Sequence, residues 1–186
     1  FFGRVGENAL EYIKAFAKWL AAAVITGGVC GLVGTAFYYC VAYATKLRGE
    51  YWWLIFLLPV CGLAIAGFYK LLGMPNDKGT NLIISSIQEH VTVPLRMSLL
   101  IFVSTVLTHL FGGSAGREGA ALQIGGAMGA AGAKAIRADE PTRKILTLCG
   151  MSAVFAALFG TPLTAAVFCI EVINVGLFYG AELLPC

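Results

Sequence analysis

The chain has 186 residues, of which 59% are hydrophobic and only 12% are charged, and its formal net charge is +3. A soluble domain carries about twice that share of charged residues, so we expect lipid to be the solvent for most of the surface. The composition predicts an all-α membrane protein, and the absence of a basic stripe argues against a nucleic-acid partner.

The first part of the chain contains two uncharged stretches long enough to cross a bilayer. Residues 5–18 mix apolar and charged positions in a helical pattern and predict an amphipathic helix at the membrane interface. Residues 19–45 predict a tilted spanning helix that ends in a short charged loop at 46–50. Residues 51–69 predict a second span with a kink or break at Pro59.

The middle of the chain is a polar turn followed by a helix that is too short to cross a membrane. Glycine, proline and asparagine gather in residues 73–81, a composition typical of turns. Residues 82–88 predict a short helix whose N-cap is Thr80 or Asn81. Beyond it, residues 97–116 form a third apolar run.

The last part of the chain predicts helices that begin or end at membrane depth. A fourth apolar run covers residues 119–133, and the uncharged stretch 145–170 is divided by Gly160-Thr161-Pro162. Helices that begin inside apolar sequence present free N–H groups and the positive end of their dipole to an anion. Together these elements predict a bundle of tilted and broken transmembrane helices.

The basic residues predict an orientation for this bundle. With the N-terminus in the cytoplasm and each run crossing in turn, ten lysines and arginines fall on the cytoplasmic side, and only Lys46 and Arg48 fall outside. Cytoplasmic loops of membrane proteins carry such an excess. We therefore expect a multi-pass protein of the cell membrane with a cytoplasmic N-terminus.

The main candidate for chemistry is Glu118, a carboxylate in glycine-rich sequence between two apolar runs. An ionisable residue at membrane depth is costly and indicates function. Ionised, Glu118 could accept hydrogen bonds from the unpaired amides of a helix start, and protonated it could swing away and admit an anion. It would then be a gate. The alternative is a structural cap or a buried pair with Arg117.

Uncharged donors at two helix starts are the second candidate, because they suit a small anion that must also leave. The expected anion-site residues are Gly79, Thr80, Asn81, Arg117, Gly119 and Ala120. An ordinary N-cap is the alternative for the first three. His109 is either a packing or interhelical hydrogen-bonding residue or a proton relay. No spacing of Ser, His, Asp or Cys predicts an enzyme, a metal site or a cofactor.

Two motifs carry a resemblance to a known family. Gly116-Arg117-Glu118-Gly119 and the following Gln123-Ile124-Gly125-Gly126 resemble the signature of CLC chloride channels and transporters, and Phe168-Cys169-Ile170-Glu171 matches a later helix. The resemblance implies a homodimer with a separate anion path in each subunit, surrounded by membrane lipid. It also implies that Glu118 is the gating glutamate.

The same resemblance implies a domain organisation. Residues 1–18 would be the interfacial helix, and residues 19–178 the first of two inverted-repeat halves of the CLC-type transmembrane domain. Residues 179–186 would begin the following segment, so that the second half is absent from this chain.

Departures from the family pattern favour one of its branches. The Gly-Ser-Gly-Ile-Pro segment of chloride members reads Gly79-Thr80-Asn81-Leu82-Ile83, and Val172 stands where proton-coupled chloride exchangers carry an inner glutamate. Proline after the gate motif is replaced by Ala120, and Met74-Pro75 is an alternative placement of the altered anion motif. These features resemble the bacterial fluoride/proton antiporters of the inner membrane.

That branch implies exchange of fluoride for protons, with Glu118 as both gate and proton carrier. One alternative is a chloride channel or chloride/proton exchanger of the same family. Another, from a different class, is a membrane scaffold subunit that transports nothing.

Overall fold

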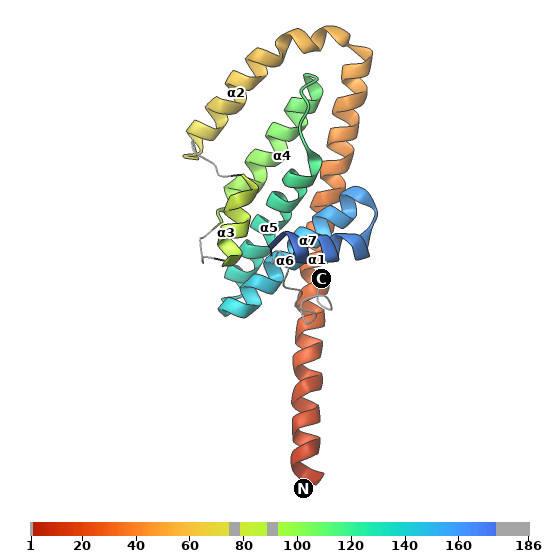
Figure 1. Cartoon of the computed structure of the whole chain (residues 1–186), viewed down its shortest axis with the longest axis vertical. Coiled ribbons are helices and arrows are strands. Elements are labelled where there is room, and N and C mark those ends of the chain that lie inside the picture. The colour runs from red at the N-terminus through yellow and green to blue at the C-terminus, as the bar shows by residue number, and fades with distance from the viewer. Residues whose placement is uncertain (1, 75–78, 89–92, 174–186) are drawn as a thin grey trace.

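All regular structure in residues 2–74, 79–88 and 93–173, the part of the chain that this computed structural model describes, is helical. The elements are α1 (Phe2–Glu50), the 3-10 helix η1 (Trp52–Leu57), α2 (Leu58–Leu71), α3 (Thr80–Gln88), α4 (Leu95–Leu110), α5 (Arg117–Ala135), α6 (Glu140–Phe159) and α7 (Pro162–Ile173). The predicted all-α fold is confirmed for these residues. Figure 1 shows a bundle from which the N-terminal part of α1 extends, while η1 and α2 arch away from the other end of α1.

Three helical stretches in the described ranges are long and apolar enough to cross a membrane. They are Leu20–Glu50, Trp52–Leu71 and Glu140–Phe159. Helices α4 and α7 are apolar but shorter. The first two stretches cover all but the first residue of the predicted spans 19–45 and 51–69, and the short apolar helices agree with the prediction of segments that do not span alone.

Helix α1 is less interrupted than the sequence suggested. It runs from Phe2 to Glu50 without a break, so the segment 5–18 continues directly into the predicted span. The predicted loop at 46–50 is wrong. Lysine, leucine, arginine and glutamate are good helix formers, and they extend the helix here until Tyr51 leaves the helical conformation with φ −116° and ψ 75°.

The C-terminal half of α1 packs into the bundle through one buried face. Phe37 and Val41 are fully buried there, and the Phe37 ring lies 5.2 Å from the ring of Phe102 on α4. A Cβ added at Gly34 would lie 2.9 Å from the Cβ of Ala157 on α6. Glycine at this position therefore lets α1 approach α6 closely, as small residues do in membrane helix pairs.

Segment η1–α2 shows the predicted break at Pro59. The chain changes from 3-10 to α-helix at Leu58, and Pro59 lies in the first turn of α2, where a missing N–H costs no hydrogen bond. Most of this segment is not covered by other helices, and Leu71 is 84% exposed. In a bilayer, lipid or further protein would cover that apolar surface.

Helix α4 ends earlier than predicted, and this sets the depth at which α5 begins. The expected run 97–116 was too long at its end, because Phe111 caps α4 and Gly112 has φ +81°, a conformation that favours glycine. The chain then turns back, and Figure 1 shows α5 beginning partway along the bundle. The predicted helix start between two apolar runs is observed, and its depth in a membrane stays a prediction.

Helices α5 and α6 are in backbone contact through glycines on both sides. A Cβ added at Gly125 would collide with the carbonyl oxygen of Gly150 and lie 2.8 Å from the Cα of Met151. On α3, Ile83 occupies the space beside Gly126, with its Cγ2 2.7 Å from the position that a Cβ would take. The middle of α5 is thus fixed between α6 and α3.

The last two helices confirm the predicted division at Gly160. Helix α6 ends in Phe159, and Gly160 adopts the left-handed conformation with φ +71° while its N–H donates to the Ala156 carbonyl. This is a common way to end a helix. Helix α7 then starts at Pro162, so the stretch 145–170 forms two helices, the first of which begins five residues earlier than expected, at Glu140.

Candidate functional site

The first turn of α5 places Glu118 beside unpaired backbone amides. Gly116 is the N-cap, with φ −67° and ψ 134°, and Glu118 is the acidic residue of the first turn. A Cβ added at Gly116 would lie 3.3 Å from the Glu118 Oε2, so the carboxylate lies back over the helix start. Negative charge is favourable there, by about 0.3–1 kcal/mol at exposed sites, and the Glu118 side chain is exposed.

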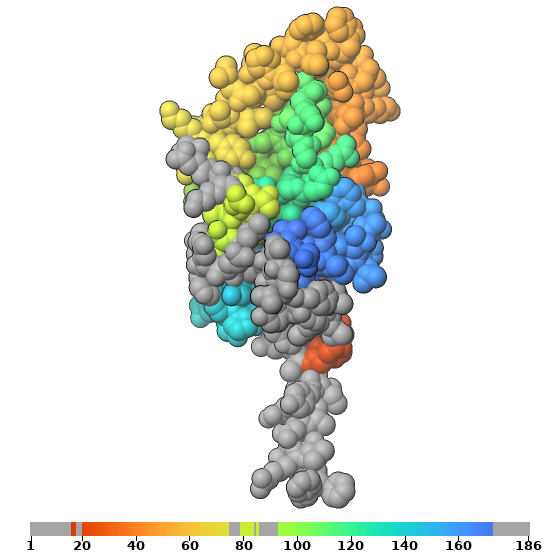
Figure 2. All heavy atoms as spheres, viewed as in Figure 1, coloured from red at the N-terminus to blue at the C-terminus, as the bar shows by residue number. Residues whose placement is uncertain are grey.

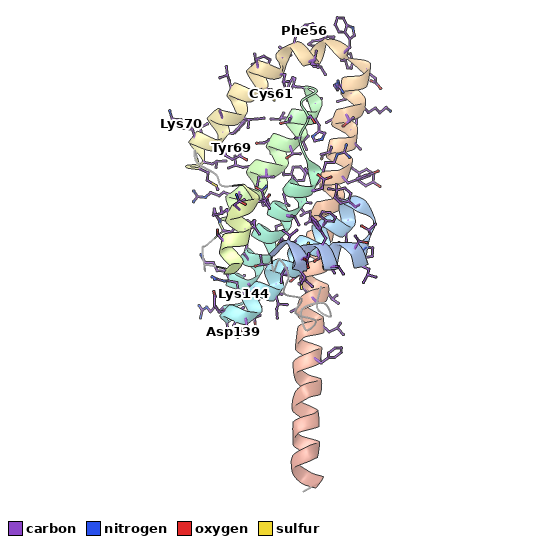
Figure 3. The ribbon with its side chains drawn as sticks, in the orientation of Figure 1. Phe56, Cys61, Tyr69, Lys70, Asp139 and Lys144 are labelled. Atoms are coloured by element: carbon purple, nitrogen blue, oxygen red, sulfur yellow. The ribbon has the colours of Figure 1, made fainter. Side chains whose placement is uncertain are left out.

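A cavity of ≈ 560 Å³ lies next to this helix start. Its lining comes from α2, α4, α5 and the residue before α3: Tyr69, Gly79, Ile101, Ser104, Thr105, Gly116, Gly119, Ala120 and Gln123. None of these residues carries a formal charge. Figure 2 shows a hollow in the face of the molecule that is turned to the viewer, between α2 on one side and α4 and α5 on the other. In Figure 3, Tyr69 lies on the side of α2 that is nearer α4, and Lys70 points away.

A side-chain hydrogen bond joins the start of α3 to α5 at the edge of this cavity. The Nε2 of Gln123 donates to the Oγ1 of Thr80 over 3.1 Å. A Cβ added at Gly119 would lie 3.2 Å from the same hydroxyl oxygen and 3.8 Å from the amide nitrogen. The absence of a side chain at Gly119 therefore keeps the Thr80 hydroxyl uncovered.

The predicted anion-site residues fall into two groups. Gly79, Gly119 and Ala120 line the cavity, and Thr80 is joined to its lining through Gln123. Arg117, Glu118 and Asn81 are not among the lining residues, although the flanking glycines of the first two are. Asn81 is exposed on α3. The part that each residue plays in binding stays a prediction.

The capping prediction for α3 is wrong. Thr80 is the first residue of the helix, not its N-cap, and Asn81 follows inside the first turn. The preceding residue, Gly79, has φ +60°, and glycine adopts this conformation without steric cost. Donors at this helix start therefore include backbone N–H groups and the Thr80 hydroxyl.

The alternative site residues lie elsewhere. Met74 and Val172 are partly buried and pack against the hydrophobic core of the bundle. The Nδ1 of His109 lies 2.8 Å from the carbonyl oxygen of Thr105 in its own helix, so the expected hydrogen bond is intrahelical rather than interhelical. In the described ranges, no group of three His, Cys, Asp or Glu residues could hold a metal ion.

Sequence reasoning missed four polar lining residues, as well as Ile101 and Gly116. Tyr69, Ser104 and Thr105 stood inside apolar runs, and Gln123 stood inside the family motif without an assigned role. The adjacent pair Ser104 and Thr105 was the available signal, because two hydroxyl residues side by side in an apolar helix need polar partners or a cavity. For Gln123 the available signal was its spacing of four residues from Gly119, which places both residues on one face of α5.

Comparisons with known proteins agree with this architecture. The family model for the voltage gated chloride channel matches residues 61–184. A chloride/fluoride channel protein of Pseudomonas syringae pv. tomato is 40% identical over 178 residues, which are 95% of this chain and 39% of that protein. An H(+)/Cl(-) exchange transporter ClcA of Vibrio campbellii is 30% identical over 169 residues, which are 80% of this chain and 35% of that transporter.

A solved structure extends the comparison to the fold. The crystal structure of a CLC-type fluoride/proton antiporter superposes with a TM-score of 0.85 at 34% identity, covering 91% of this chain and 43% of that one. The chain thus spans about two fifths of the length of the Pseudomonas relative and of this antiporter. Three helices of the described residues are long and apolar enough to cross a bilayer, and the family model matches more than half of the chain. The chain is therefore a multi-pass membrane protein and belongs to the CLC family of voltage-gated chloride channels and transporters.

Proposed function

We propose that the chain contributes the anion path of a fluoride/proton antiporter, in which Glu118 is the gate and the proton carrier. One observation carries this proposal: a cavity lined by hydroxyl, amide and glycine residues meets the first turn of α5, which holds a carboxylate. Fluoride is a small, strong hydrogen-bond acceptor, so hydrogen-bond donors that are fixed in place can bind it without a cationic side chain.

The exchange would work by alternation at the start of α5. Ionised Glu118 lies over the N–H groups of the helix start, which its position beside Gly116 supports. Once protonated, the side chain no longer competes for these donors, and an anion takes its place. Glu118 would then release its proton on the other side of the membrane, and the returning carboxylate would expel the anion.

Transport of chloride is the second candidate. The 30% identical relative in Vibrio campbellii is named an H(+)/Cl(-) exchange transporter, whereas the 40% identical relative is named a chloride/fluoride channel protein. Val172 stands where the family resemblance places an inner glutamate in chloride exchangers, and this favours the fluoride branch. A subunit that transports nothing would have no use for a carboxylate beside this cavity.

Efflux from liposomes tests the function. The full-length protein is reconstituted, the vesicles are loaded with sodium fluoride or sodium chloride, and anion and proton fluxes are recorded together. We expect fluoride efflux coupled to proton uptake and little chloride efflux. In Glu118→Gln we expect coupling to be lost, whereas Glu171→Gln, an exposed acid on α7, keeps it. Chloride flux equal to fluoride flux would refute the selectivity.

Assembly and orientation belong to the same proposal. The complete protein would be a homodimer in a bacterial inner membrane, with the N-terminus in the cytoplasm and residues 19–178 as the first inverted half of the transmembrane domain. The excess of basic residues on one side supports this orientation. Single cysteines in a cysteine-free background at Lys18 and at Lys46 should react with an impermeant maleimide from the cytoplasmic and the outer side respectively.

A further inference from the structure

We propose that Gln123 is a positioning residue that turns the Thr80 hydroxyl proton toward the cavity, an inference that rests on anion binding in this cavity. The distance of 3.1 Å from the Gln123 Nε2 to the Thr80 Oγ1 makes the hydroxyl oxygen an acceptor. A hydroxyl has one proton and two acceptor lone pairs. Because the Gln123 amide occupies one lone pair with a donor, the O–H proton of Thr80 must point to another partner.

Because Thr80 stands at the start of α3, its hydroxyl proton points most readily toward the cavity. In helix interiors a threonine hydroxyl often donates to the carbonyl four residues earlier, as Thr45 and Thr108 do here. Thr80 is the first residue of α3, so no preceding helical turn offers such a carbonyl. Gly119 of α5 lies beside the hydroxyl and has no side chain to cover it.

The register of α5 brings these parts together. Gly119 and Gln123 are four residues apart and share one face of the helix, and both line the cavity. On this face Gly119 leaves a gap. One turn further along the helix, the side-chain amide of Gln123 donates to the Thr80 hydroxyl, which lies beyond that gap. The hydroxyl is thus presented as a donor, which suits an anion and opposes a cation.

A fixed donor should act on anion affinity. If the hydroxyl had to reorient on binding, part of the hydrogen-bond energy would be spent on ordering it. Replacement of Gln123 by methionine, which has a similar length and no donor, should therefore weaken binding by about threefold to tenfold, the size of one hydrogen bond. Gln123→Glu should weaken it more, because a carboxylate accepts the Thr80 proton and withdraws the donor from the cavity.

The test is a double-mutant cycle in the full-length protein, with the half-saturating fluoride concentration and the maximal rate measured in liposomes. We expect Gln123→Met to raise the half-saturating concentration about threefold to tenfold with a smaller change in maximal rate. In the Thr80→Val background, Gln123→Met should add nothing, since the hydroxyl that it positions is gone. In the Thr80→Ser background, which keeps a hydroxyl, the loss should reappear.

Controls separate this inference from the transport function. Thr45→Val removes a hydroxyl that donates to its own helix and should leave the half-saturating concentration unchanged. Calorimetric titration of the purified variants with sodium fluoride gives the affinity without transport. Equal affinities of wild type and Gln123→Met, or losses that add in the Thr80→Val background, would overturn the positioning role even if antiport is observed. Wild type that binds fluoride without proton-coupled flux would refute antiport alone.

Discussion

The start and the middle of α5 use glycine in opposite ways. In the middle, at Gly125 and Gly129, the missing side chain brings the backbone of α6 into contact, whereas at the start, at Gly116 and Gly119, it leaves room beside a cavity. The packed middle fixes the helix axis, and the open start presents unpaired N–H groups. A helix that is held at its middle can fix donors at its start without a side chain to carry them.

The largest effect is expected at the packed middle of α5. In Gly125→Ala the new Cβ would collide with the Gly150 carbonyl and lie 2.8 Å from the Met151 Cα, and backbone atoms cannot move aside as a flexible side chain can. Overpacking of this kind costs about 1–3 kcal/mol and occasionally more. We expect a marked loss of monodisperse protein in detergent, measured by size-exclusion chromatography and thermal unfolding.

Gly132→Ala is the matched control for that substitution. It lies on the same helix, and a Cβ there would meet nothing within 4 Å. Alanine is favoured over glycine in helices by about 1 kcal/mol, so the melting temperature should stay equal or rise. If Gly125→Ala behaved like Gly132→Ala, close contact of α5 with α6 would not be what fixes the helix.

A substitution at the open start of α5 should change function and not stability. In Gly119→Ala the Cβ would lie 3.2 Å from the Thr80 Oγ1, close enough to cover the hydroxyl while requiring a shift of only a few tenths of an ångström. We expect normal folding and a fluoride affinity lower by about tenfold, because the donor loses access to the anion. Fluoride titration and melting temperature measured on one preparation check both halves of this prediction.

An unchanged affinity in Gly119→Ala would contradict the proposed use of the open start of α5. A loss of folding equal to that of Gly125→Ala would contradict the comparison itself. In that case both the start and the middle of α5 would be packing surfaces, and the cavity would be only a gap between helices.

Sequence patterns predicted the features of this site that arise from local chemistry. Pro59 and Gly160 divide their helices because their backbone preferences act within one turn. The helix start beside Glu118 could be predicted from glycines that interrupt apolar sequence, although α5 begins at Arg117, two residues earlier than expected. The resemblance to CLC proteins then supplied the family, which the family model confirms.

Features that depend on distant packing could not be predicted. The Thr80–Gln123 hydrogen bond joins residues that are 43 positions apart, and neither residue type indicates its partner. The charged segment 46–50 resembled a loop because charge is rare in membrane spans, yet four of its five residues, all except Gly49, favour helix. The role of Ser104 and Thr105 as lining residues depends on where α2 lies, and the sequence does not fix that position.

The smallest effect separates backbone conformation from packing. Gly160 has φ +71°, and a Cβ there would meet nothing within 4 Å, so Gly160→Ala introduces only the cost of a left-handed conformation, about 1 kcal/mol. Gly160→Asn should cost less, because asparagine tolerates this region. The melting temperature should therefore fall in the order wild type, asparagine, alanine, with fluoride affinity unchanged. An equal loss in both variants would mean that the site between α6 and α7 is closed in the membrane, and that packing, as at Gly125, also decides this turn.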